Sequence, residues 1–279
     1  MYLGLDLGTS SLKAIVIADD QEIVAEASAD LTVSRPHDGW SEQAPSDWIA
    51  AAENVLDSLA ASNDLAAIRG IGLSGQMHGA TVLDKSNSVL RPAILWNDTR
   101  SADEAAAMDA DPRWRNITGN IVFPGFTAPK LAWMQANEPH LFKLVGKVLL
   151  PKDYLRLWLT GDCVSDMSDA AGTSWLDTGK RDWSDELLGI SNLGREHMPR
   201  LVEGSEPSGT LRNEVAVRWG MRQDVVVAGG GGDNAASAVG VGVVVAGQAF
   251  VSLGTSGVLF AANEGYAPDP ETAVHTFCH

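Results

Sequence analysis

The chain opens with the stretch MYLGLDLGTSSLKAIVIA, residues 1–18, in which two strand-like apolar runs flank the turn Leu7–Ser10. The same four residues, LGTS, recur at Leu253–Ser256 within QAFVSLGTSGVLF, with the same layout. A Gly/Ser/Thr turn between two strands exposes backbone N–H groups and hydroxyls that can bind an anion. Two such turns favour a protein whose two halves hold one polyphosphate. Either turn could equally be a hairpin connection with no ligand.

Asp6 distinguishes the first turn from the second. A carboxylate beside a phosphate-binding turn can hold Mg²⁺ directly or through water. Ser252 precedes the second turn, which has no acid before it. We therefore expect only the first turn to supply a carboxylate that directs a metal ion.

The composition indicates a soluble globular protein in a reducing compartment. Of the 279 residues, 45% are apolar and 20% are charged, and 36 acids against 20 bases give a net charge of −16. This charge argues against a nucleic-acid or anionic-membrane partner, and a phosphate ligand would need local donors. Cys163 and Cys278 lack metal-site spacing. We expect a cytoplasmic protein without a signal peptide or a membrane span.

The order of apolar patterns predicts a mixed α/β sheet. Strands are expected in residues 1–30, then a helix after an N-cap at Ser46 or Asp47, and then a strand over Ile68–Leu73. Residues 96 to about 205 differ in pattern and are interpreted as an insertion or subdomain beside the sheet. A strand at 225–228 and a second helix follow, and this order suits an α/β fold.

Asp233 is the strongest candidate for a catalytic group. It follows four glycines and precedes Asn234 and a helical run. Glycines let the backbone approach a ligand closely, and a carboxylate placed there can accept a proton from an attacking hydroxyl. The simpler alternative is that Asp233 only caps the next helix.

The loop SGQMHG, residues 74–79, is the second candidate, because it leaves the end of a predicted strand, where α/β sheets commonly bind ligands. Gln76 and His78 offer donors and acceptors for hydroxyl groups, and Met77 offers an apolar wall. A structural histidine in a turn is the alternative, and this segment alone favours it.

Trp96 and Arg100 form a third candidate, a wall on which a sugar could stack. The alternative is that Trp96 belongs to the core and Arg100 pairs with an acid. Three further acids in loop-like stretches are expected to be solvated or to cap helices rather than to act in catalysis: Asp153, Asp166 and Asp169.

Together these motifs resemble the FGGY carbohydrate kinases of the sugar kinase/Hsp70/actin superfamily. The resemblance runs along essentially the whole chain. It rests on GLDLGTSSLKA (4–14), GLSGQMHGA (72–80), LWNDTR (95–100), PKDYLRLWLTG (151–161), SDMSDAAGT (165–173), RDWS (181–184), GGGDNAA (230–236) and SLGTSG (252–257). It implies a ribonuclease H-like, actin-like α/β fold.

The resemblance also implies roles for individual residues. Asp233 would be the catalytic base, Asp6 the carboxylate near Mg²⁺, and Met77 and His78 the sugar-binding pair. Gln76, Asn234, Trp96 and Arg100 complete our set of candidate sugar-binding residues. The phosphate turns would be Gly8, Thr9 and Ser10 and, in the second copy, Gly254, Thr255 and Ser256.

The implied reaction transfers a phosphoryl group from ATP to D-xylulose. Alternatives are a kinase for ribulose, gluconate or glycerol, a non-catalytic sugar-binding module, and an actin- or Hsp70-like ATPase; a homodimer is left open. We expect residues 1–245 to form the family's sugar-binding domain and residues 246–279 to begin its ATP-binding domain. Most of that second domain is expected to be missing, which leaves open whether this chain alone binds ATP or is active.

Overall fold

A mixed sheet forms the centre of the protein, as the sequence predicts, and it has seven strands. The computed structural model describes residues 1–253 and 257–279. The strands run in the order β13-β14-β5-β1-β2-β3, and β15 also pairs with β5. Their bounds are β1 Tyr2–Leu7, β2 Ser11–Ile17, β3 Ile23–Asp30, β5 Gly70–Gly75, β13 Pro207–Thr210, β14 Val226–Ala228 and β15 Gly231–Gly232.

Side-chain alternation along β1 shows why the N-terminal sequence forms this strand. Leu3, Leu5 and Leu7 are buried on one face, while Gly4 and Asp6 lie on the other and are half-buried. Because successive strand residues point to opposite faces, the leucines pack into the core and Asp6 is left facing the opposite side of the sheet.

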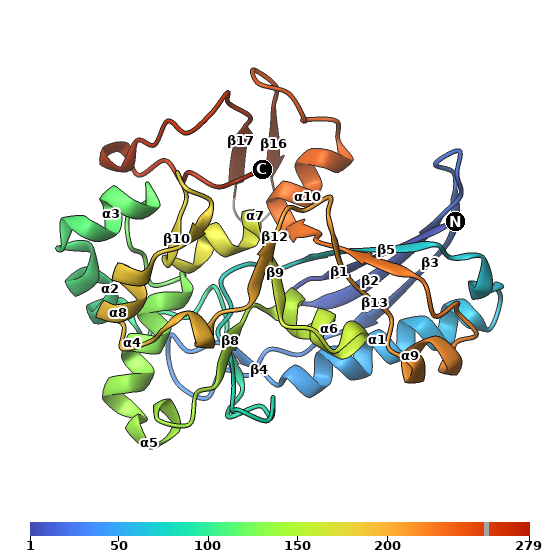
Figure 1. Ribbon diagram of the computed structural model, residues 1–279, viewed down its shortest axis with the longest axis horizontal. Helices are drawn as coiled ribbons and strands as arrows, with labels where there is room; N and C mark the ends of the chain where they lie inside the picture. Colours follow the sequence, from blue (N-terminus) through green and yellow to red (C-terminus); the bar gives the residue numbers. More distant parts are fainter. Residues whose placement is uncertain (254–256) are drawn as a thin grey trace.

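Three helices lie below the sheet in Figure 1: α1 Pro45–Ala60, α6 Pro151–Thr160 and α9 Asn213–Arg218. The buried face of α1 carries Trp48, Val55 and Leu56 at helical spacing. The predicted N-cap at Ser46 or Asp47 is wrong. Ala44 is the N-cap, without a side-chain hydrogen bond, and the helix starts at Pro45 because proline lacks the N–H group that would be unpaired there.

A second apolar core lies beside the sheet, where Figure 1 shows a group of helices away from α1. Its helices are α2 Ala102–Asp109, α3 Pro112–Thr118, α4 Thr127–Asn137, α5 Pro139–Phe142, α7 Met167–Ala170 and α8 Asp185–Ile190. Short strands accompany them: β4 Glu42–Gln43, β6 Thr81–Leu83, β7 Ala93–Ile94, β8 Lys147–Leu149, β9 Val164–Asp166, β10 Leu176–Asp177, β11 Asp182–Trp183 and β12 Arg200–Val202.

Most of the segment expected as an insertion, 96 to about 205, packs in this second core. Helix α6 does not, because its Leu155 and Leu159 belong to the first core under the sheet. The bounds of the insertion therefore stay a prediction. The short 3₁₀ helices are Leu65–Ala67, Ala171–Thr173, Arg195–His197 and Pro270–Thr272.

The C-terminal part contains helix α10 (Asp233–Gly240) and a hairpin of β16 (Ala249–Leu253) and β17 (Gly257–Ala261). The predicted hairpin strands are confirmed, and the turn Gly254, Thr255 and Ser256 lies outside the described residues. After the hairpin the chain returns to the second core, where Asn120 Nδ2 donates to the Thr276 carbonyl oxygen at 2.9 Å. Within the described part of the chain, none of the helices combines the length and the apolar character needed to cross a membrane.

The glycine run before Asp233 is required by close packing. Gly230 has φ +74°, and a Cβ atom there would lie 2.1 Å from the Leu73 carbonyl oxygen of β5. At Gly232 a Cβ atom would lie 2.7 Å from Met77 Cγ. The run can therefore lie directly against β5 and the following loop only without side chains.

We predict that Gly230→Ala lowers the free energy of unfolding by about 2 kcal/mol or more, because the new methyl group meets backbone and the left-handed conformation disfavours alanine. Urea titration followed by circular dichroism measures the change. The matched control is Gly189→Ala, in α8, where nothing lies within 4 Å of the added Cβ atom. That substitution should raise stability by about 0.5 kcal/mol. Equal effects of the two would contradict the packing argument.

Candidate functional site

Parallel pairing brings three strand ends to one edge of the sheet. Asp6 of β1 lies opposite Ser74 of β5, and Ser74 lies opposite Gly231 of β15. The three segments that follow these strands are the turn at 8–10, the loop at 76–79 and helix α10. The carboxyl edge of parallel strands is where α/β sheets place ligands, so the predicted Asp6 turn, the histidine loop and Asp233 meet there.

Asp233 is the first residue of α10 rather than its cap, because Gly232 occupies the N-cap position. The Asp233 Oδ1 atom accepts hydrogen bonds from the Asn234 backbone N at 2.7 Å and from Asn234 Nδ2 at 3.0 Å. Asn234 therefore orients the carboxylate. The side chain remains open to solvent.

The pKa of the Asp233 carboxyl lies above its ordinary value. Partial burial among protein atoms is the main cause, the charge of nearby Asp6 adds to it, and the hydrogen bonds from Asn234 oppose it. A carboxylate with a raised pKa is a better proton acceptor than an ordinary one. The surroundings of Asp233 therefore suit the role of a base.

The His78 ring is held in a defined tautomer. Its Nδ1 atom lies 2.8 Å from the Gly172 carbonyl oxygen, and a carbonyl only accepts, so Nδ1 carries the proton and donates. Burial, together with the charge of Lys130, lowers the pKa of His78 to about 3. The neutral ring therefore offers Nε2 as a hydrogen-bond acceptor, which suits a hydroxyl donor.

The backbone of the His78 loop rests on a buried lysine. The Lys130 ammonium donates to the carbonyl oxygens of His78 at 3.0 Å, of Phe126 at 3.1 Å and of Gly125. Burial lowers the pKa of Lys130 to about 7. The three carbonyl acceptors favour its charged form, since an ammonium donates three hydrogen bonds. The sequence analysis did not single out Lys130.

Met77 connects the histidine loop to the glycine run. Its side chain is buried and lies against Gly232, as the close approach at that glycine shows. Met77 and His78 belong to one loop and Asp233 to a segment far away in sequence, and the two segments lie at the same edge of the sheet. The structure brings these three predicted residues together.

Gln76 supports the first turn from below. Its side chain is buried, and Thr9 Oγ1 donates to Gln76 Oε1 at 3.1 Å. Gln76 Nε2 donates to the Gly8 carbonyl oxygen at 3.4 Å and to Gln43 Oε1 at 3.1 Å. The structure places this predicted sugar ligand under the turn, with its amide group occupied by protein.

Trp96 and Arg100 are placed in different surroundings. Trp96 is 42% exposed, and its Nε1 donates to Thr9 Oγ1 at 3.0 Å, beside the first turn. The Arg100 side chain is buried, pairs with Glu42 and Asp98 at 2.7 Å each, and lies over the Trp40 ring. Of the two, only Trp96 presents a surface to solvent near the turn.

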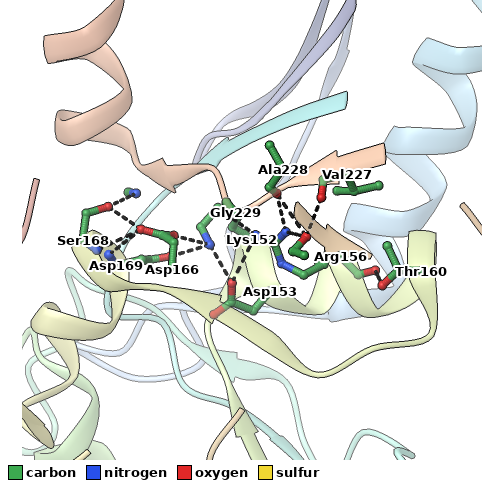
Figure 2. A network of polar contacts seen from close by, with 12 residues as sticks. Lys152, Asp153, Arg156, Thr160, Asp166, Ser168, Asp169, Val227, Ala228 and Gly229 are labelled. Atoms are coloured by element: carbon green, nitrogen blue, oxygen red, sulfur yellow. Dashed lines mark hydrogen bonds and ion pairs between the residues drawn. The ribbon is translucent and has the colours of Figure 1, made fainter. Parts of the chain in front are cut away.

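A buried cluster of charges lies below the glycine run (Figure 2). Lys152 Nζ lies 2.6 Å from Asp153 Oδ1, 2.8 Å from Asp166 Oδ1 and 3.4 Å from Asp169 Oδ2, and all four side chains are buried. The expectation that these acids are solvated or act only as caps is wrong, although Asp166 does cap α7. Their oxygens are close enough together to hold a metal ion, but the lysine ammonium already supplies the cation.

Arg156 extends the cluster to the start of the glycine run, where it donates to the carbonyl oxygens of Ala228, at 2.6 Å, and Gly229. Burial raises the pKa of Asp169 well above its usual value. A sequence signal existed for the two cations, because both share a helix face with Leu155 and Leu159.

Comparison with known proteins gives consistent matches. Residues 1–240 match the N-terminal domain of the FGGY family of carbohydrate kinases. The xylulose kinase of Klebsiella pneumoniae is 58% identical over 280 residues, and that of Escherichia coli (strain K12) is 57% identical over 280 residues. Each match covers 100% of this chain and 58% of the relative.

Solved structures agree with these matches. A crystal structure of a xyloylose kinase from Brucella ovis superposes with a TM-score of 0.99 at 64% identity, over 100% of this chain and 58% of that one. The xylulose kinase of Rhodospirillum rubrum gives a TM-score of 0.92 at 30% identity, over 96% of this chain and 56% of that one. The chain therefore spans less than two thirds of the length of these relatives. The fold that it shares with them is the actin-like fold that the sequence analysis predicts.

We predict that His78 makes stability depend on pH. The unfolded histidine binds a proton below pH 6.5, while the folded one does so only below about pH 3. Between these values the unfolded state binds more protons, so this contribution is complete above pH 6.5 and is lost as the pH falls toward 3. Its slope is at most about 1.4 kcal/mol per pH unit.

Urea titrations between pH 4 and pH 7 measure the effect by comparing the chain with His78→Asn, since asparagine tolerates the left-handed backbone at this position (φ +68°). The substitution should flatten the pH dependence, whereas His140→Asn, at an exposed position, should not. Parallel pH profiles of the chain and His78→Asn would contradict the assignment of a neutral His78.

Proposed function

Because the chain belongs to the FGGY family of carbohydrate kinases, we propose that it forms the sugar-binding part of an ATP-dependent kinase for D-xylulose. The product would be D-xylulose 5-phosphate. The two relatives at 57–58% identity along the whole chain carry the name xylulose kinase and support this substrate over ribulose, gluconate or glycerol. Neighbours at about 24% identity, such as a gluconate kinase from Lactobacillus acidophilus, support the fold alone.

The convergence of Asp233, Met77 and His78 is the observation that carries the proposal. Asp233 and His78 Nε2 are both acceptors, and the buried Met77 side chain packs between their two segments. A ketose presents hydroxyl donors, so it matches these two acceptors. An ATPase without sugar chemistry would need no such loop.

In the proposed reaction Asp233 accepts the proton of the sugar's terminal hydroxyl group. As that oxygen forms its bond to the γ-phosphorus atom of ATP, the bond from this phosphorus to the ADP oxygen breaks. The proton passes to the carboxylate whose pKa is raised by its surroundings, and ADP leaves with the electron pair of the broken bond. Asn234 holds the carboxylate in place through two hydrogen bonds.

Asp6 is the proposed carboxylate for Mg²⁺. It lies half-buried at the end of β1, and no side chain in residues 1–253 or 257–279 donates a hydrogen bond to it or pairs with its charge. A carboxylate without a partner in the described part of the chain, beside the turn at 8–10, is a ligand that Mg²⁺ accepts directly or through water. When bound, the ion would neutralise charge on the phosphates of ATP, for which Gly8, Thr9 and Ser10 are the proposed turn.

Residues 246–279 are proposed to begin the ATP-binding domain, with residues 1–245 as the sugar-binding domain. The hairpin β16–β17 supports this, because Val251, Leu253 and Leu259 are 61%, 83% and 73% exposed, and a continuous apolar surface usually marks a contact. Gly254, Thr255 and Ser256 would be its phosphate turn. A cytoplasmic location and a homodimer complete the proposal.

We predict that Asp233→Asn lowers kcat for D-xylulose about 10³-fold, because the amide cannot accept the proton while the electrostatic positioning of the substrates remains. The assay couples ADP release to NADH oxidation in the complete polypeptide that carries this chain. Asp224→Asn is the matched control, since Asp224 is exposed and pairs only with Arg222 among the described residues. Equal rates for wild type and Asp233→Asn would remove Asp233 from the mechanism.

A sugar panel in the same assay separates D-xylulose from ribulose, gluconate and glycerol. Calorimetry on residues 1–279 alone, with D-xylulose and no nucleotide, tests the second candidate, a sugar-binding module. We expect binding that His78→Asn weakens at least tenfold, since the substitution removes the Nε2 acceptor. Phosphorylation of glycerol in preference to D-xylulose would contradict the proposed substrate.

A further inference from the structure

We propose that Ser168 is a positioning residue for Asp233, because its hydroxyl group links the buried Lys152 cluster to the backbone amide that precedes the base. This inference rests on the proposed role of Asp233. It adds a residue that touches neither sugar nor nucleotide, and it assigns a purpose to charges that the reaction itself does not use.

The direction of each hydrogen bond in this link is fixed by chemistry. Ser168 Oγ lies 2.5 Å from Asp166 Oδ2 and 3.1 Å from the Gly232 backbone N. A carboxylate only accepts, so the hydroxyl donates to Asp166 and accepts from Gly232. Asp166 in turn pairs with Lys152. The result is a continuous chain from the lysine ammonium to the N-cap residue of α10, directly before Asp233.

The glycine run is held at both ends by the same cluster. Arg156 binds the carbonyl oxygens of Ala228 and Gly229 at its start, and Ser168 binds the amide of Gly232 at its end. Between them, the Gly230 backbone N donates to the Gly204 carbonyl oxygen at 2.8 Å. Glycines have no side chains with which to fix their own backbone, so these outside contacts determine where the run lies.

Stability alone is a weak reason to bury so many charges. Two cations and three carboxyl groups lose water on burial, and similar clusters can often be replaced by apolar residues without loss of stability. Hydrogen bonds in a buried polar chain polarise one another and fix geometry strongly. We therefore infer that the cluster holds the glycine run rigidly in place rather than adding to the stability of the fold.

The backbone of the His78 loop is held by groups outside the Lys152 cluster, because the His78 carbonyl oxygen is bound by Lys130 and by Thr127 Oγ1 at 3.1 Å. Only the Met77 side chain of this loop touches the glycine run. Loss of the Ser168 hydroxyl should therefore displace the base and leave the His78 loop in place. A small misplacement of a catalytic group lowers the chemical rate strongly. The expected signature is a fall in kcat with little change in the KM for sugar.

The test compares Ser168→Ala with Ser165→Ala in the complete polypeptide. Ser165 is also buried, and its hydroxyl has no hydrogen-bond partner within the described part of the chain. The two variants thus lose the same buried atom at neighbouring positions. We expect Ser168→Ala to lower kcat about tenfold with KM for D-xylulose changed less than twofold. Ser165→Ala should change both constants less than twofold.

Amide hydrogen exchange at Gly232 supplies a readout without catalysis, on residues 1–279 as they stand. Exchange should become about tenfold faster in Ser168→Ala, because the amide loses its acceptor, and should stay unchanged in Ser165→Ala. Equal kcat values in the two serine variants, or unchanged exchange at Gly232, would overturn the inference and leave the proposed function intact. A wild-type protein that phosphorylates no sugar would overturn the proposed function and the catalytic part of the inference, while exchange would still decide whether Ser168 fixes Gly232.

Discussion

The pairing of β5 with a parallel strand on each side is the constraint on which the candidate site depends. It places β1 and β15 next to the same strand and ends all three at one edge. Because a slip of one residue would turn every side chain to the other face, the buried leucines of β1 also fix the side on which Asp6 lies. The core of the protein and the geometry of the site are therefore determined by one register.

Two buried lysines hold the loops that follow these strands in place. Lys130 binds the backbone of the His78 loop, and Lys152 anchors the acids below the glycine run. Loops that approach a ligand closely cannot be fixed by large apolar side chains of their own, since these would fill the space. Charged groups placed below them achieve the same rigidity through hydrogen bonds to carbonyl and amide groups.

The sequence predicted the local features of this site better than the long-range contacts that hold its residues in place. Strands around the LGTS repeats and the first helix follow from short patterns, and the structure contains them. The pairing of Gly231–Gly232 with β5 as strand β15 did not follow from the glycine run. The surroundings of Gln76, Arg100 and Lys152 did not follow, because their partners Gln43, Glu42 and Asp166 lie in other segments. A polar residue in a motif can bind a ligand or hold the chain, and only long-range packing separates these two roles.

The character of the polar groups also fits the proposed phosphoryl transfer in a chain with a net charge of −16. Asp233 and the neutral His78 are acceptors and lie on the side proposed for the sugar, whose hydroxyls donate. The turn after β1 offers the Ser10 hydroxyl and backbone N–H groups instead, which suit phosphate oxygens. The Thr9 hydroxyl is already used within the protein, because it donates to Gln76 Oε1. A ligand that donates hydrogen bonds and a ligand that accepts them would thus bind at different parts of the same edge of the sheet. The proposed function does not need electrostatic attraction by the whole protein, because hydrogen bonds at close range would select each proposed ligand.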